Sequence, residues 1–465
     1  MNRTVSKVLV ANRGEIALRI IRACRDLGIA TVAAVSEADR DSLPAREADR
    51  AICIGPARPS RSYLRVDTIV TAALGTGCDA VHPGYGFLAE QPELPETCET
   101  HGLVFIGPQA DTIRRMGDKL HARKLVRDIG IPVIPGSELV RDYRAAQRAA
   151  GRVGYPVLLK AAAGGGGKGM KIVRRREDLK ASFYEASAEA LAAFGDGRVY
   201  IEHYIPDARH IEVQVLGDRF GKVVHLFERD CSVQRRYQKM IEEAPSPAVT
   251  EELRERMCRA AVLIAGKMNY LGAGTVEFIF DQQEQNFYFL EMNTRIQVEH
   301  PVTEMITGID LVREQIRIAA GLPVGFQQNE VKRSGHAVEC RINAELPDDD
   351  FMPSPGIITR WEPPEGDGIR VDSHCYAGYE VPPYYDSLLA KLIVTGEDRD
   401  AAIQHMHRAL SRFVVSGVHT TIPFHRFVME RDDYRSGRFN TSWIEDTVLD
   451  HYNRRWREAT GTEFV

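Results

Sequence analysis

The stretch Pro156–Val173 reads PVLLKAAAGGGGKGMKIV and joins two short apolar segments through a run of glycines. Pro156–Lys160 and Met170–Val173 have the length and the apolar content of strands, and Gly164–Gly169 lies between them. Successive glycines allow backbone N–H groups to approach and bind a phosphate group, and Lys160 is close enough in sequence to contact the same group. The stretch therefore predicts a small phosphate-binding unit.

Two familiar glycine motifs do not fit this loop. A Walker A motif needs glycine at position 162 and serine or threonine at position 169, where the chain has Ala162 and Gly169. Gly164, Gly166 and Gly169 satisfy the dinucleotide pattern formally, but a strand rather than a helix follows them. A glycine-rich hairpin without a ligand stays open as the structural alternative.

The glycine stretch belongs to a small unit over residues 132–205. Beyond it the chain predicts a helix near Asp178–Ala193 and a strand at Val199–His203. A small unit built around a glycine loop favours a lid that closes over a ligand. The rest of the chain, with helices at Glu251–Met268 and around Asp310–Ala320, mixes α and β elements without internal repeats.

The first hundred residues alternate short strands with helices. Apolar side chains recur at helical spacing from Ile16 to Leu27, and Gly28 follows as a stop signal. The strands are expected at Lys7–Val10, Ile29–Val35, Ala51–Ile54, Asp79–His82 and Leu103–Ile106. This alternation predicts a doubly wound, Rossmann-like α/β domain over residues 1–118.

Composition and charge exclude several classes of protein. The 465 residues are 44% hydrophobic and 27% charged, as in a folded globular chain, and the net charge of −5 gives no basic footprint for nucleic acid. The longest stretch without Asp, Glu, Lys or Arg, Phe413–His425, has 13 residues and is too short to span a bilayer. The N-terminus lacks a secretory signal, and the eight cysteines are scattered, so we expect a cytoplasmic protein with reduced thiols.

Two apolar segments, Thr275–Phe280 and Phe287–Asn293, predict an antiparallel hairpin around a polar turn. If Glu277 lies opposite Glu291, then Asp281 lies opposite Phe287 and the loop is residues 282–286. Strand alternation then places Glu291 and Asn293 on the same face as Phe287 and Phe289.

Opposed carboxylates on such a face repel each other and lose hydration, and a divalent cation would remove the conflict. Glu277, Glu291 and Asn293 offer only oxygen ligands, which favours Mg²⁺ or Mn²⁺ completed by phosphate groups. Two solvated carboxylates on an exposed face remain the structural alternative.

Charged residues gather on both sides of this hairpin. The segment 294–304, TRIQVEHPVTE, follows it, while residues 228–239 and Arg341 bring further cations. Such cations could bind a small anion, with Glu299 as a nearby general base. Charged segments are often merely solvated, and Glu299 could also pair with Arg295 to hold the loop, so the spacing leaves these alternatives open.

From about Val8 to about Phe439 the sequence resembles biotin carboxylase of the ATP-grasp superfamily. The motifs that carry the resemblance are ANRGEIA (11–17), HPGYGFL (82–88), MGDK (116–119), the glycine loop, residues 228–239 and residues 291–303, all in family order. The resemblance implies an α/β fold with an α+β C-terminal part. Its parts are the N-terminal domain (1–118), an ATP-grasp domain (119–321) with a mobile lid (about 132–205), a C-terminal domain (322–450) and a tail (451–465).

The resemblance also implies roles for individual residues. ATP contacts would fall on Lys119, Lys160, Gly166, Gly167, Glu202, His203, Tyr204, Ile205, His210 and Tyr237, and the metal ligands on Glu277, Glu291 and Asn293. Bicarbonate would contact Lys239, Arg295, Gln297 and Val298, with Glu299 as the base and Arg341 facing biotin. Tyr237 stands where the family more often has His or Asn, and His203 where it often has Lys; both positions touch nucleotide rather than bicarbonate.

The implied reaction is the ATP- and bicarbonate-dependent carboxylation of biotin on a separate biotin carboxyl carrier protein, through carboxyphosphate. Since no biotinyl or carboxyltransferase domain fits in the 465 residues, we expect a single component that forms a homodimer and works with carboxyltransferase subunits. Acetyl-CoA carboxylase is preferred over another acyl-CoA or pyruvate carboxylase. Two other hypotheses are an ATP-grasp ligase that forms an acyl phosphate and a catalytically silent regulatory subunit; Lys239, Arg295 and Glu299 argue against the latter.

Overall fold

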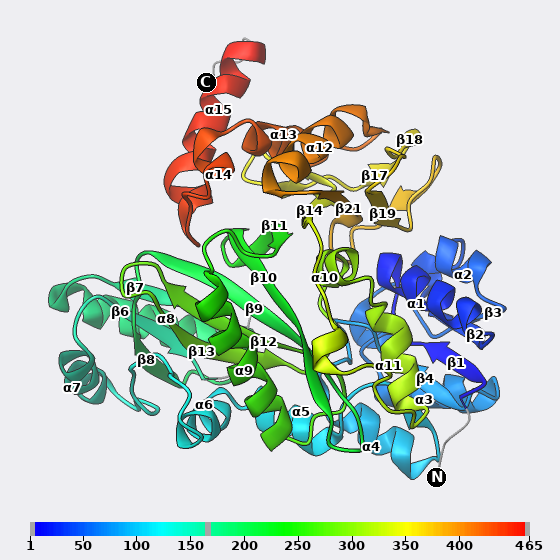
Figure 1. The fold of residues 1–465 in the computed structure, drawn as a ribbon, viewed down its shortest axis with the longest axis horizontal. Helices are drawn as coiled ribbons and strands as arrows, with labels where there is room; N and C mark the ends of the chain where they lie inside the picture. Colours follow the sequence, from blue (N-terminus) through cyan, green and yellow to red (C-terminus); the bar gives the residue numbers. More distant parts are fainter. Residues whose placement is uncertain (1–4, 163–168, 461–465) are drawn as a thin grey trace.

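The computed structural model describes residues 5–162 and 169–460, and Gly166 and Gly167 of the predicted phosphate loop lie outside these ranges. Its N-terminal part is a parallel sheet with the strand order β3-β2-β1-β4-β5, drawn in blue in Figure 1. The strands are β1 (Lys7–Val10), β2 (Ala30–Val35), β3 (Arg50–Cys53), β4 (Ala80–His82) and β5 (Val104–Phe105). The order reverses at β1, which confirms the predicted doubly wound domain.

The first helix, α1 (Gly14–Asp26), shows why this part folds as predicted. Its apolar face, including Ile16 and Ile20, is buried in the core, and the chain leaves the helix through Gly28 at a φ of +69°. The other elements here are α2 (Leu43–Glu47), α3 (Val66–Gly75), α4 (Glu93–Thr100), α5 (Ala110–Gly117) and the 3₁₀ turns Glu37–Asp39 and Pro59–Arg61.

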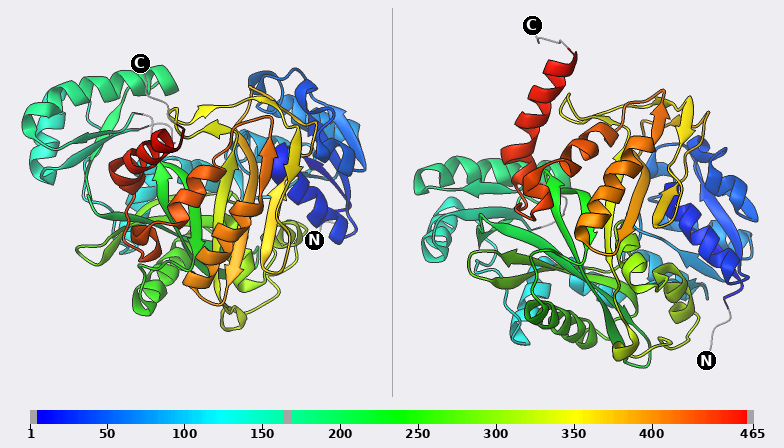
Figure 2. Two further views of the ribbon diagram at one scale, coloured as in Figure 1. Left: turned by 90° about the horizontal axis from the view of Figure 1, so that it is seen from above. Right: turned by 45° about the horizontal axis from the view of Figure 1, so that its top comes forward.

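After α6 (Lys119–Asp128), the small unit over residues 132–205 projects from the body on the side away from the N-terminal sheet (Figure 2). We call it the lid unit. Its antiparallel sheet has the order β7-β6-β8, and the base of the glycine stretch is closed by a hydrogen bond from the Ala161 N–H to the Gly169 carbonyl (3.2 Å). The elements are α7 (Tyr143–Val153), β6 (Val157–Ala161), β7 (Lys171–Val173), a 3₁₀ turn (Arg176–Asp178), α8 (Leu179–Phe194) and β8 (Val199–His203).

The centre of the molecule is an eight-stranded antiparallel sheet with the order β13-β12-β9-β10-β11-β14-β21-β19. Helix α9 (Glu251–Lys267) packs against β9 and β10, over a core that includes Phe278 and Phe289. The strands are β9 (Ala208–Gly217), β10 (Val223–Arg235), β11 (Gln238–Ala244), β12 (Gly272–Asp281), β13 (Asn286–Asn293), β14 (His336–Asn343), β19 (Ile369–Ser373) and β21 (Leu388–Gly396). The sheet continues from β11 to β14 and so joins the middle of the chain to its C-terminal part.

The remaining elements surround this sheet (Figures 1 and 2). Helices α10 (His300–Thr307) and α11 (Leu311–Ala319) follow β13, and α12 (Arg399–Arg412) packs on β14 and β21. The others are a 3₁₀ turn (Gln328–Glu330), β15 (Glu345–Leu346), β16 (Met352–Pro353), β17 (Gly356–Ile357), β18 (Arg360–Glu362), β20 (Glu380–Val381), β22 (Val414–Ser416), α13 (Ile422–Met429), α14 (Asp432–Arg435), a π-helix (Ile444–Val448) and α15 (Leu449–Thr460).

The β12–β13 hairpin differs from its prediction at one end. Glu277 does lie opposite Glu291, but a bulge at the next position shifts the register, so Asp281 lies opposite Asn286 and not Phe287. The bulge also changes which side chains of β13 share a face of the sheet. Phe287 and Phe289 are buried in the core with Met292, while Glu291 and Asn293 line a cleft on the other side, so the predicted shared face is wrong.

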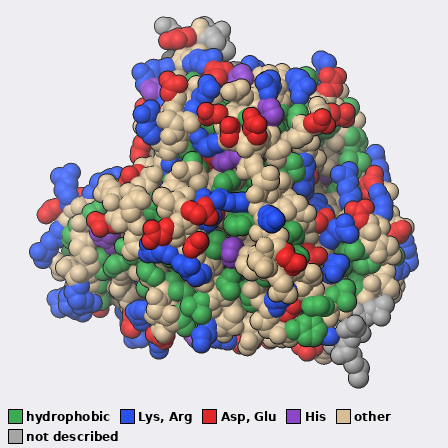
Figure 3. Space-filling view, in the orientation of Figure 1, with side chains coloured by type: hydrophobic (Ala, Val, Ile, Leu, Met, Phe, Trp, Pro, Cys, Tyr) green, Lys and Arg blue, Asp and Glu red, His purple; other side chains and the backbone are tan. Residues whose placement is uncertain are grey.

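Within the described ranges, the helices are all too short or too polar to cross a membrane. Figure 3 shows basic and acidic side chains intermixed over the face that is seen there.

Candidate active site

One cleft, with a volume of about 1220 Å³, lies where the N-terminal domain, the lid unit, the central sheet and the C-terminal part meet. Every predicted site residue within the described ranges lines it. From the lid unit and its flanks these are Lys119, Lys160, Glu202, His203, Tyr204 and Ile205; from the central sheet and the loop after it, His210, Tyr237, Lys239, Glu277, Glu291, Asn293, Arg295, Gln297, Val298, Glu299 and Arg341. The fold thus brings together residues more than 200 positions apart.

At the lid side of the cleft, ammonium groups face carboxylates. Lys160 Nζ lies 2.5 Å from Glu202 Oε2, and Lys119 Nζ lies 2.8 Å from Glu291 Oε2. Glu202 also pairs with Arg123. Burial raises the pKa of Glu202, but Lys160 and Arg123 outweigh it and hold the pKa below its usual value. Both ammonium groups thus lie in the cleft, where phosphate oxygens can replace the carboxylates as their partners.

Tyr237 stands at the edge of the cleft, in the tight turn between β10 and β11. Arg235 and Gln238 pair across this turn, and the two residues between them have positive φ values, +48° for Arg236 and +65° for Tyr237. A two-residue turn of this kind follows the twist of the strands but normally favours glycine or asparagine. The turn places the half-exposed Tyr237 ring over the cleft.

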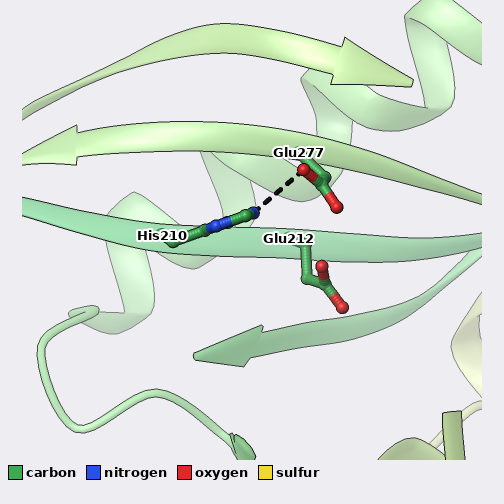
Figure 4. A group of neighbouring side chains, drawn as sticks. All are labelled: His210, Glu212 and Glu277. Carbon is green, nitrogen blue, oxygen red and sulfur yellow. Dashed lines mark ion pairs between the residues drawn. The ribbon is translucent and has the colours of Figure 1, made fainter. Parts of the chain in front are cut away.

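Deeper in the cleft, His210 and Glu212 of β9 lie beside Glu277 of β12, as Figure 4 shows. Glu212 and Glu277 are cross-strand partners, and His210 Nε2 lies 3.0 Å from Glu277 Oε2. Burial lowers the pKa of His210, but Glu277 raises it more, so the net shift is upward. These side chains are close enough to share a metal ion. Glu212, however, already pairs with the fully buried Arg229 (2.6 Å).

The predicted metal ligands Glu277, Glu291 and Asn293 present carboxylate and amide oxygens to the same cleft. The repulsion expected between the two carboxylates is relieved by cations from neighbouring elements, Lys119 on Glu291 and Lys239 on Glu277. This donor set consists of hard oxygens and fits Mg²⁺ or Mn²⁺.

Lys239 and Arg341 hold Glu299 from two sides. Lys239 Nζ lies 2.6 Å from Glu299 Oε1, and Arg341 Nη2 donates to Glu299 Oε2 at 3.0 Å. Glu299 is fully buried at the residue before α10, a helix with Pro301 in its first turn. Burial raises the pKa of Glu299, but Lys239 and Arg341 lower it more, so the carboxyl stays ionised. The sequence alternative of a Glu299–Arg295 pair does not match these contacts.

Arg295 instead reaches across the loop before α10. Its Nε donates to Glu90 Oε2 (3.0 Å) and its Nη1 to Gln297 Oε1 (2.9 Å), while Gln297 Nε2 donates to Glu277 Oε1 (3.1 Å). The cleft floor therefore carries a chain of hydrogen bonds from Arg295 to Glu277, next to the Lys239–Glu299 pair. An anion bound here would meet fixed cations and an ionised carboxylate that can accept a proton.

Sequence reasoning missed several residues of this network. Three of them are fully buried: Glu212 pairs with Arg229 and Lys239, and Glu242 pairs with Arg341. Two others pair with predicted site residues, Glu90 with Arg295 and Arg123 with Glu202. One signal was available in β9, where His210, Glu212 and Gln214 alternate with Ile211 and Val213. Polar residues at a spacing of two inside an apolar strand indicate that one face of the strand carries hydrogen-bonded polar side chains, as in a functional site.

Comparison with known proteins assigns the chain to a family. Three family models match, biotin carboxylase N-terminal domain (residues 4–113), carbamoyl-phosphate synthase L chain ATP binding domain (118–326) and biotin carboxylase C-terminal domain (339–446). Biotin carboxylase 1 of Bacillus subtilis (strain 168) is 54% identical over 442 residues, 95% of this chain and 98% of that protein. One of the pyruvate carboxylase subunits of Methanothermobacter thermautotrophicus is also 54% identical, over 95% of this chain and 90% of that protein.

Two solved structures have the same fold along nearly the whole chain. Biotin carboxylase of Campylobacter jejuni superposes with a TM-score of 0.93 at 47% identity and covers 95% of this chain and 99% of that one. The biotin carboxylase domain dimer of Hydrogenobacter thermophilus 2-oxoglutarate carboxylase, in complex with MgADP, ADP and bicarbonate, gives 0.93 at 48% identity, with 97% and 99% covered. The chain therefore belongs to the biotin carboxylase family and is an ATP-dependent ligase of the ATP-grasp type.

Proposed function

We propose that this enzyme carboxylates biotin carried on a separate biotin carboxyl carrier protein, with ATP and bicarbonate as the other substrates. The observation that carries the proposal is the ionised, fully buried Glu299 held between Lys239 and Arg341 at the floor of the cleft. An ATP-grasp ligase that activates another carboxylate would not need this arrangement. Nor would a silent regulatory subunit need to hold these charges inside a cleft.

The lid side of the cleft would bind ATP. The nucleotide contacts are Lys119, Lys160, Gly166, Gly167, Glu202, His203, Tyr204, Ile205, His210 and Tyr237. Glu277, Glu291 and Asn293 would hold Mg²⁺, or Mn²⁺, which when bound neutralises charge on the phosphate oxygens. On ATP binding, Lys119 and Lys160 exchange their carboxylate partners for phosphate oxygens and keep the terminal phosphate in place.

Bicarbonate would bind against Lys239, Arg295, Gln297 and Val298. Glu299 accepts the bicarbonate proton at a carboxylate oxygen as the bicarbonate oxygen forms a bond to the γ-phosphorus of ATP. The bond from that phosphorus to the bridging oxygen breaks, which gives ADP and carboxyphosphate. The C–O bond of carboxyphosphate then breaks and gives CO₂ and phosphate. The phosphate accepts the proton of the ureido nitrogen as that nitrogen bonds to the carbon of CO₂, and Arg341, which faces the same space, would stabilise the negative oxygen of biotin.

We also propose the assembly in which the enzyme works. The enzyme would supply the first half-reaction of a multi-subunit carboxylase in the cytoplasm, with separate carboxyltransferase subunits that choose the acceptor. We favour acetyl-CoA carboxylase, with another acyl-CoA carboxylase or pyruvate carboxylase as the alternative. The related biotin carboxylase domain of Hydrogenobacter thermophilus is described as a dimer, which supports a homodimer of this chain.

The test is a single-turnover experiment with ¹⁴C-bicarbonate, MgATP and free biotin. We expect labelled carboxybiotin and ADP to form in equal amounts, and both to disappear when bicarbonate is left out. The matched control is the Glu299→Gln variant, which keeps the shape of the side chain. Bicarbonate-independent ADP formation without labelled biotin would instead identify another ATP-grasp ligase, and a protein that binds ATP without any turnover would identify a regulatory subunit.

A further inference from the structure

A row of charged side chains crosses three neighbouring strands of the central sheet. Lys391 of β21 lies opposite Arg341 of β14 on one side and opposite Asp372 of β19 on the other. Residues directly opposite one another on adjacent strands share a face of the sheet. We call residues 294–299, between β13 and α10, the reactive loop. Helix α10 packs against β14 and β21 (Figure 1), so this row lies beneath the loop.

Two members of the row, Lys391 and Arg341, bind consecutive residues of the loop. Lys391 Nζ donates to the carbonyl oxygen of Val298 at 2.9 Å, and Arg341 Nη2 donates to the Glu299 carboxylate at 3.0 Å. Arg341 lines the cleft, whereas Lys391 is fully buried and does not. Lys391 thus contacts two residues that line the cleft, Val298 through its backbone carbonyl and Glu15 through its carboxylate.

Lys391 is held in turn by the N-terminal domain. Its Nζ lies 3.1 Å from Glu15 Oε1 and 3.6 Å from Asp372 Oδ2, and the Tyr85 hydroxyl donates to the same Glu15 oxygen. Burial lowers the pKa of Lys391, but Glu15 and Asp372 raise it more, so the group stays charged. The ammonium group therefore donates a hydrogen bond to the Val298 carbonyl and has two carboxylates as ion-pair partners.

Charge compensation alone does not account for Lys391. Asp372 already pairs with Arg370 at 2.7 Å, and the charge of Glu15 could be avoided by a neutral residue that keeps the Tyr85 hydrogen bond. A fully buried lysine is costly, and an apolar residue with a neutral partner at position 15 would serve the core at least as well. Such a replacement would lose the hydrogen bond to the Val298 carbonyl oxygen.

We propose that Lys391 is a positioning residue for the bicarbonate step, which fixes the backbone at Val298 and thereby the place of the Glu299 carboxylate. The inference rests on the proposed function, because it needs Glu299 to act on bicarbonate. Lys391 touches no substrate. Its loss would misplace the base rather than remove it.

The test compares Lys391→Met with the double variant Lys391→Met/Glu15→Gln. The single variant leaves Glu15 buried without its cation, so it should lose stability as well as activity. The double variant removes both charges and should regain most of the lost melting temperature. Its kcat for bicarbonate-dependent ATP cleavage should nevertheless stay about 10- to 100-fold below that of Glu15→Gln alone, which carries the same change in the cleft lining, with the KM for ATP unchanged, because the Val298 contact is still missing.

Arg399→Met is the matched control, because Arg399 pairs with buried Glu243 in the same part of the molecule but lies away from the cleft. It should lower the melting temperature and leave kcat unchanged. If kcat of the double variant recovers together with its melting temperature, Lys391 serves the fold only and the inference is wrong. A wild-type enzyme without bicarbonate-dependent ATP cleavage would overturn the proposed function itself, before any variant is compared.

Discussion

Lys239 shows how the active site is prepared for an anion. Its ammonium group contacts three carboxylates, those of Glu212 (2.7 Å), Glu277 (3.0 Å) and Glu299 (2.6 Å). Burial lowers the pKa of Lys239, but these carboxylates raise it well above its usual value. An anion that binds here therefore meets a cation that its neighbours already hold in place.

Replacement of Glu299 tests the proposed proton transfer. Glu299→Gln keeps the shape and the hydrogen-bonding capacity but cannot accept the bicarbonate proton. General-base assistance is typically worth about 10²- to 10⁴-fold, so kcat for bicarbonate-dependent ATP cleavage should fall by about that factor. ATP affinity, measured by calorimetric titration, should stay close to wild type, because Glu299 contacts Lys239 and Arg341 rather than the lid side.

Lys239→Gln provides the comparison for this variant. It removes a charge that binds the anion, so it should raise the KM for bicarbonate in addition to lowering kcat. If Glu299→Gln retains more than about a tenth of the wild-type kcat, a base role on the usual scale is excluded. If it loses ATP affinity and melting temperature together with kcat, Glu299 holds the loop instead.

At the scale of elements, the β12–β13 hairpin shows where sequence periodicity is reliable. The opposition of Glu277 and Glu291 was predictable, because the apolar segments and the polar turn fix the approximate register. The bulge between this pair and Phe278–Phe289 was not. It depends on packing, because it turns Phe287 and Phe289 into the core while Glu291 still faces the cleft.

The strands and helices that the sequence predicted mostly lie within one or two residues of the observed ones, as for Lys7–Val10 and Asn286–Asn293, because their apolar spacing is strong. The central strands β9 to β11 and the elements after α11 were not predicted. The candidate residues within the described ranges all line one cleft. They could be named from the sequence because they lie in long motifs or on the hairpin. Partners such as Glu212 and Arg229 could not be named, because their role depends on which strands become neighbours. The assigned roles themselves stay predictions.

Substitution of Glu291 tests the metal site on the hairpin. Glu291→Lys places a cation where the metal should bind and beside Lys119, which now contacts Glu291 at 2.8 Å. Activity should vanish at every Mg²⁺ concentration, while circular dichroism shows the folded content unchanged, since the Glu291 side chain is 31% exposed.

Glu284→Lys is the control, with the same charge change in the exposed turn of the same hairpin. It should keep the activity and the Mg²⁺ dependence of the wild type. Full activity of Glu291→Lys, or of the wild type after exhaustive chelation, would remove this site from the mechanism.

For the whole molecule, the continuous sheet explains why the active site depends on distant parts of the chain. The pairing of β11 with β14 brings Arg341 beside Glu242, and the Arg341–Glu299 contact then joins the C-terminal part to the reactive loop. No local pattern predicts this pairing, because antiparallel neighbours separated by about a hundred residues are selected by tertiary packing. The proposed boundary at residues 321 and 322 does not interrupt the sheet.

The same junction predicts how stability depends on pH. Glu243 of β11 is buried, with Arg399 Nε at 2.6 Å and His336 Nε2 at 2.8 Å. Burial raises the pKa of Glu243, but Arg399 and His336 lower it to about 2. A carboxyl whose pKa is lowered by folding stabilises the native state above its unfolded pKa, about 4.3, and loses that contribution as the pH falls toward 2. With about 1.4 kcal/mol for each pKa unit, the contribution is about 3 kcal/mol at neutral pH.

Arg399→Met should therefore be less stable than wild type by about 3 kcal/mol at pH 7, because it leaves Glu243 buried without its main partner. The difference should shrink as the pH falls below the pKa of Glu243 in the variant and toward about 2, its pKa in the wild type, since Glu243 becomes neutral in the variant first and its need for a cation disappears. Urea unfolding of both proteins at a series of pH values between 7 and 3 measures this difference. A difference that stays constant over that range would show that Arg399 stabilises the junction through packing on Tyr434 rather than through the charge of Glu243.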